Sequence, residues 1–116
     1  MNLDKIMSLF ALFSKQSSAE YLPLVMLSMA EVGNRLKPGA NKEDQRLCAL
    51  CAAVANLHFA EADAAREKQL LTSAGNVAVS PGSTRYKAAR DMADGYCAAC
   101  ADLLEDRAFL FFGTPG

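Results

Sequence analysis

Apolar residues along the first third of the chain recur at the spacing of α-helices. Near the N-terminus they return at three- and four-residue steps, at Leu3, Ile6, Met7, Phe10 and Phe13. After Pro23 the apolar positions are Leu24, Val25, Leu27, Met29, Val32 and Leu36. Such stripes turn one face of a helix toward a core, so we expect one helix over residues 3–13 and a second from Pro23 to the Lys37-Pro38-Gly39 stop.

The middle and the last third of the chain predict two longer helices. Asn41 is the expected N-cap of the third, whose core positions among many alanines are Leu47, Leu50, Cys51, Val54, Leu57 and His58. Ser83 is the expected cap of the fourth, and its stripe is Tyr86, Ala89, Met92, Ala93, Tyr96, Cys97, Cys100, Leu103 and Leu104. Between them the helical period disappears from Glu67 to Gly82, where Val77 and Val79 form the only plausible strand material.

The predicted fold class is therefore all-α, a small bundle of about four helices in a single helical domain over residues 1–116. We expect a projecting loop or short extended segment before the last helix. A length of 116 residues and a hydrophobic content of 52% suit one shared core. The apolar tail at residues 108–112 needs burial, either on this subunit's own core or against a neighbour.

Charge and hydropathy narrow the classes of partner. The chain has 12 basic and 13 acidic residues without a basic stretch, so we expect no sequence-specific nucleic acid partner. Charged residues interrupt every long apolar run, which predicts a soluble chain with no membrane partner. Asp4 and Lys5 interrupt the N-terminal segment, which therefore predicts a helix and no signal peptide.

Two Cys-x-x-Cys pairs offer the sharpest chemical hypothesis. Cys48 with Cys51 and Cys97 with Cys100 could together complete a tetrahedral zinc site. Both pairs lie in helical patterns without a turn residue, and a three-residue step also places them on a buried face as small apolar residues. We favour free core thiols in a reducing compartment, and keep a small zinc-binding helical protein as the alternative function.

The sequence contains no recognisable catalytic machinery. It has no Gly-rich phosphate loop, zinc-protease motif or nucleophile elbow, so we expect no enzyme, no catalytic residue and no cofactor. His58 is the single histidine and lies between Leu57 and Phe59, which favours a core or boundary side chain bonded to a backbone carbonyl. A small enzyme or regulator that pairs His58 with a nearby carboxylate is the remaining hypothesis.

The order of these features resembles the small head-tail connector, or head-completion, proteins of tailed bacteriophages and prophages. The resembling segments are residues 3–13, 24–32, 43–59, 73–80 and, after an Ala-rich helix, 103–113. The resemblance implies a virion assembly protein that self-associates into a ring and docks portal and tail proteins. It also implies a location in the bacterial cytoplasm, where a prophage encodes it, or in the virion.

The same resemblance implies which residues make contacts between subunits. In the family the loop and the terminal segment contact neighbouring subunits, which assigns that role here to Val77, Val79, Phe109, Phe111 and Phe112. The alternative is that these side chains fold back on their own subunit. The sequence leaves both possibilities open.

Overall fold

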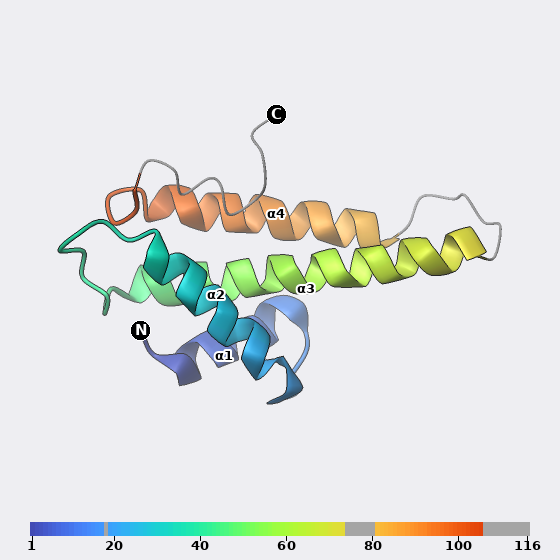
Figure 1. The fold of residues 1–116 in the computed structure, drawn as a ribbon, viewed down its shortest axis with the longest axis horizontal. Coiled ribbons are helices and arrows are strands. Elements are labelled where there is room, and N and C mark those ends of the chain that lie inside the picture. Colours follow the sequence, from blue (N-terminus) through green and yellow to red (C-terminus); the bar gives the residue numbers. More distant parts are fainter. Residues whose placement is uncertain (18, 74–80, 106–116) are drawn as a thin grey trace.

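The computed structural model describes residues 1–17, 19–73 and 81–105, except for the side chains of residues 67–73 and 81–83. These residues form four α-helices and one 3₁₀ turn, η1. The elements are α1 (Leu3–Ser14), η1 (Ala19–Tyr21), α2 (Leu22–Asn34), α3 (Gln45–Ser73) and α4 (Pro81–Ala99). The long helix α3 is central, with α4 along one side of it and α1 and α2 on the other (Figure 1). The predicted all-α bundle of four helices is confirmed.

Helices α1 and α2 cover α3 with the stripes that the spacing predicts. The Asn2 side chain accepts a hydrogen bond from the amide of Lys5 at 3.1 Å and so caps α1. Ile6 and Phe10 are buried on α1, as are Val25 and Val32 on α2. These four side chains belong to the same core cluster as the apolar residues of α3. Both short helices are therefore held mainly by packing on α3.

Helix α3 is buried nearly all round over its first half. Every residue from Leu50 to Leu57 is buried, and many are alanines, which let neighbouring helices approach closely from several sides. Its stretch Gln45–Arg66 is long and apolar enough to cross a membrane by length and composition, and 61% of the most apolar window is buried in the bundle. The core helix of a globular domain has the same composition because all its faces are covered.

The start of α3 differs from the predicted cap. Asn41 accepts a hydrogen bond from the amide of Glu43, which closes a turn before the helix. Asp44 precedes the first helical residue and accepts the amide of Arg46 at 2.9 Å, so Asp44 is the N-cap and the prediction of Asn41 was wrong. Asn and Asp both suit an N-cap, so the residue type alone does not decide between Asn41 and Asp44.

The facing ends of α3 and α4 also differ from the prediction. Helix α3 continues through Glu67 to Ser73, although the apolar period is lost there. Helix α4 begins at Pro81, so Ser83 lies inside the first turn and is not its cap. A proline suits a first helical position because its missing N–H has no partner there in any helix. The predicted loop is thus shorter at both ends, and residues 74–80 with Val77 and Val79 lie outside the described residues.

The chain after α4 crosses to the end of α2. Leu103 and Leu104 are buried but lie beyond the helix, contrary to the predicted continuous stripe. Leu104 pairs with Leu36 in an isolated antiparallel bridge, and the carbonyl of Leu103 accepts the amide of Lys37 at 2.9 Å. These bonds join segments that are far apart in the sequence.

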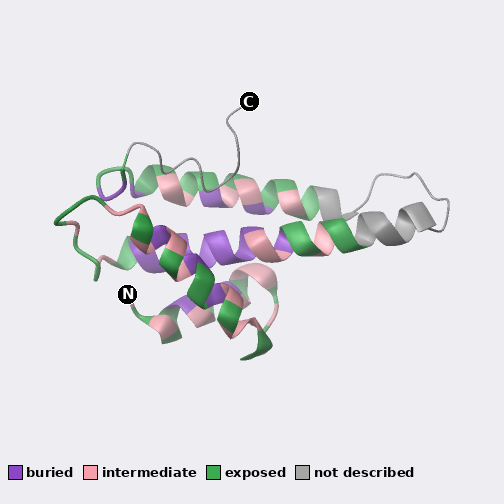
Figure 2. Cartoon of the chain, in the orientation of Figure 1, coloured by how far each residue is buried: buried purple, intermediate pink, exposed green. Residues whose placement is uncertain are grey.

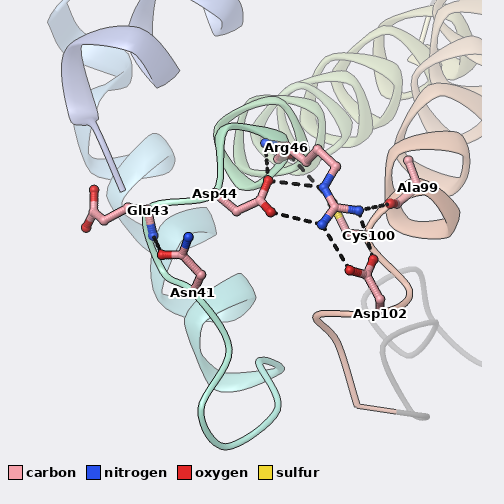
Figure 3. A network of polar contacts seen from close by, with 7 residues as sticks. All are labelled: Asn41, Glu43, Asp44, Arg46, Ala99, Cys100 and Asp102. Atoms are coloured by element: carbon pink, nitrogen blue, oxygen red, sulfur yellow. Dashed lines mark hydrogen bonds and ion pairs between the residues drawn. The ribbon is translucent and has the colours of Figure 1, made fainter.

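Arg46 ties the first turn of α3 to the end of α4 (Figure 3). Its guanidinium donates to both carboxylate oxygens of Asp44 and of Asp102, at 2.8–3.1 Å, and to the carbonyl of Ala99 at 2.9 Å. These hydrogen bonds lower the pKa of both carboxyl groups and raise the pKa of Arg46. The clamp therefore weakens when the pH falls through those lowered pKa values.

Candidate interaction surface

The interface residues that the sequence suggested fall on parts of the chain without a described structure. Val77 and Val79 lie in residues 74–80, and Phe109, Phe111 and Phe112 lie in residues 106–116. Their assignment as intersubunit contacts stays a prediction.

The four cysteines are free thiols that belong to the packing of the bundle. Cys48, Cys51 and Cys100 are buried and Cys97 is partly buried. The Cys51 thiol lies 3.3 Å from the Met1 sulfur, and the Cys100 thiol donates weakly to the carbonyl of Arg46 at 3.6 Å. Within residues 1–17, 19–73 and 81–105, no three His, Cys, Asp or Glu side chains are arranged to hold a metal ion. The described geometry therefore does not favour the four-cysteine zinc site.

Burial disfavours the thiolate form of three of these cysteines. It raises the pKa of Cys51 to about 12 and that of Cys100 to about 11, and it raises the pKa of Cys97 as well. Because the thiolate is the nucleophile and the metal ligand, the buried Cys51 and Cys100 thiols stay neutral and react slowly near neutral pH. The cysteines therefore have the chemistry of small apolar core residues.

We expect iodoacetamide to modify Cys97 well before the other three cysteines at about pH 8, because Cys97 alone is partly exposed. Peptide mass spectrometry at timed intervals measures the order. In concentrated guanidinium chloride all four thiols should react at similar rates, which provides the control. Equal rates in the native protein would show that the cysteines are accessible and would contradict their place in the core.

His58 lies between two carboxylates instead of bonding a backbone carbonyl. Its Nε2 is 2.9 Å from Glu31 Oε1 on α2, and its Nδ1 is 4.0 Å from Glu61 Oε2 on α3. The expected carbonyl partner was wrong, because the crossing of α2 over α3 brings Glu31 to the histidine. Among the described residues no Ser, Thr or Cys side chain is hydrogen-bonded to His58, so this pair lacks the nucleophile of a catalytic triad. The contact between His58 and Glu31 links α3 to α2.

The outward side of α2 is an exposed surface without charge. We call Pro23, Met26, Leu27 and Ala30 the α2 outer face; they are all exposed and follow the i, i+3, i+4, i+7 spacing of one helical stripe (Figure 2). The exposed fractions of Met26 and Leu27 are 54% and 56%. Glu31, the only charged residue of α2, pairs with His58 and so leaves this face uncharged.

The spacing of apolar residues does not reveal this surface, because α2 is apolar on most of its circumference. The prediction placed Leu27 with Val25 and Val32 on the core side, and the structure turns Leu27 to the outside. Exposed helix faces usually carry charged or polar residues, and contiguous exposed apolar side chains mark interaction sites.

No protein-family model matches this chain, and neither a curated protein nor a solved structure matches it.

Proposed function

We propose that this chain is a non-catalytic assembly protein that associates with further copies of itself through the α2 outer face. The observation that carries the proposal is a helix whose solvent side is apolar and uncharged, with Met26 and Leu27 each more than half exposed. Removing such side chains from water is favourable by about 25 cal/mol per Å². Contact with a second protein surface supplies that burial.

Within this proposal the chain is a subunit of the head-tail connector type. The support is the resemblance in the order of its segments, together with an all-helical body and an apolar face for neighbours. Its partners are then further copies and the portal and tail proteins of a phage, in the bacterial cytoplasm or the virion. No catalytic role and no cofactor are part of the proposal.

The size of the α2 outer face predicts weak association for each contact. Stable interfaces bury about 1,200–2,000 Å² in total, which four side chains on one helix cannot supply by themselves. Contacts of that kind become stable when several close a ring, because each subunit is then held on two sides. A ring also requires the face to meet a different surface on the next copy, for which residues 77, 79, 109, 111 and 112 remain candidates.

The test is the mass of the protein as a function of its concentration. We expect the weight-average mass in sedimentation velocity to rise over a roughly hundredfold range of concentration, and Leu27→Asp to stay monomeric because it places a charge in the contact. The matched control is Ala98→Asp, which adds the same charge to an exposed position of α4. Native mass spectrometry without chelator then gives the number of subunits and any bound metal.

Two results would refute this proposal. The first is a wild-type chain that stays monomeric over the whole range of concentration. The second is Leu27→Asp associating as strongly as Ala98→Asp, since the contact would then lie elsewhere. A monomer that carries one zinc ion per chain would favour the four-cysteine alternative.

A further inference from the structure

A cavity of about 270 Å³ lies where the end of α1 meets the middle of α3 and the first half of α4. Its apolar walls include Phe13 from α1, Phe59 from α3 and Met92 from α4. Three helices therefore contribute to it, and it is separate from the α2 outer face. Most of the surface inside is apolar, so the polar groups that do line it need an explanation.

Asn56 is the first of these polar groups. It is the only polar residue in the buried run from Leu50 to Leu57, and it is 7% exposed. Its amide carries two N–H donors and one carbonyl acceptor, yet no hydrogen bond joins it to any other residue within the described ranges. Its polar atoms are not fully enclosed, so water or a ligand in the cavity can supply the missing hydrogen bonds. An amide held at the wall of a cavity without such a bond is placed to bond a molecule inside it.

Two exposed cations also line the cavity. Lys15 is exposed and takes a left-handed backbone conformation with φ of 61°, and its amide bonds the carbonyl of Ala11 to end α1. Its ammonium forms no ion pair with any residue in the described part of the chain, so its positive charge is uncompensated there. Arg85 is also exposed, and its ion pair with Asp63 on α3 holds it at the cavity wall and balances its charge, so Lys15 supplies the net positive charge there.

We propose that this cavity binds a small carboxylate with a compact apolar body, such as an arylacetate or a short-chain acid. The apolar body contacts Phe13, Phe59 and Met92, and the carboxylate lies toward Lys15 and Arg85. The Asn56 amide donates to an oxygen of the same ligand. The volume is slightly below the usual range for drug-sized ligands, about 300–1,000 Å³, which selects a small molecule. This inference is independent of the proposed self-association.

Nuclear magnetic resonance of the full chain tests the proposal with phenylacetate as the probe. We expect saturable shifts in ¹H–¹⁵N spectra with a Kd of about 1 mM or lower, and the side-chain NH₂ signals of Asn56 should be among those that move. Phenylacetamide, which has the same shape without the charge, should bind roughly tenfold more weakly. Equal binding of both compounds would remove the role assigned to the cations.

Two variants separate the polar contacts from general packing. Asn56→Leu replaces the amide by an apolar side chain of similar size and should weaken binding roughly tenfold or more without loss of the fold, since no hydrogen bond within the described protein is broken. Lys15→Asn removes the charge with a residue that tolerates the left-handed conformation, and it should weaken binding about three- to tenfold. Lys37→Asn changes an exposed lysine outside the cavity and is the matched control.

The proposal fails if phenylacetate causes no shifts, or if the shifts map away from the cavity. It also fails if Lys15→Asn, a surface change that leaves the core intact, binds the probe as tightly as Lys37→Asn does. Urea unfolding of each variant confirms that the protein compared is folded. A loss of binding in both pocket variants with unchanged unfolding supports the site.

Discussion

Replacing Phe10 by alanine is expected to lower the free energy of unfolding by about 3–5 kcal/mol. Phe10 is 1% exposed, and its ring centroid lies 5.7 Å from that of Tyr21 and 6.3 Å from that of Phe59. The ring centroids of Tyr21 and Phe59 are also 5.3 Å apart. The three rings therefore join three elements: α1, the η1 turn that precedes α2, and α3. Removing the Phe10 ring leaves a cavity and breaks two aromatic contacts at once.

Urea unfolding followed by circular dichroism measures this loss. Phe13→Ala is the control, because Phe13 is only partly buried and stacks on a single ring, that of Tyr96, at 5.8 Å. It should cost clearly less than Phe10→Ala. A loss for Phe10→Ala within about 0.5 kcal/mol, the range of ordinary surface changes, would mean that the three-ring cluster does not hold the helices together.

The predictability of each helix from the sequence depended on how narrow its apolar stripe is. In α1 the apolar residues at three- and four-residue steps stand out, and the prediction placed Ile6 and Phe10 in the core correctly. In α2 nearly every position is apolar, so the periodicity could not say whether Leu27 faces inward with Val25 or outward. The side of α2 that faces the core is decided by where α3 packs against it, and that depends on contacts between residues far apart in the sequence. The surface that carries the proposed function was therefore hidden in the least informative pattern.

Helix ends were less predictable than helix cores, for local physical reasons. Asn41 and Asp44 both suit an N-cap, and Pro81 and Ser83 both suit the start of a helix, so composition offers two answers at each site. The continuation of α3 to Ser73 lacks an apolar stripe, so periodicity could not detect it. The buried positions between the ends depend on repeated spacing over several turns, and these were predicted well.

The residues of the cavity could be predicted only in part. Asn56 leaves a visible signal, a single amide in a long apolar run, although the run does not say what the amide faces. Lys15 and Arg85 are ordinary surface cations in the sequence and line one cavity only because three helices converge. The pairing of His58 with Glu31, 27 positions apart, is of the same kind. Such sites arise from tertiary packing and have no local motif.

The second large effect is expected in the second turn of α3, where Leu50→Ala should lower the free energy of unfolding by about 2–5 kcal/mol. Leu50 is 0% exposed, and α1, α2 and α4 all pack on this helix, so the cavity left behind cannot easily close. Small domains have only about 5–15 kcal/mol in total, so this one change removes a large share of it. The urea midpoint at constant m-value measures the loss.

Two further variants serve as comparisons for the stability loss of Leu50→Ala. Cys51→Ala, also at a fully buried position, should cost less than Leu50→Ala because it removes a smaller volume, and EDTA should leave both midpoints unchanged. Leu27→Ala, on the α2 outer face, should stay within about 0.5 kcal/mol when measured at low protein concentration. If Cys51→Ala unfolded the protein while Leu50→Ala was tolerated, the thiol would have a role beyond packing, and metal binding would have to be reconsidered. The expected order instead follows buried volume alone, which is what a bundle built around α3 requires.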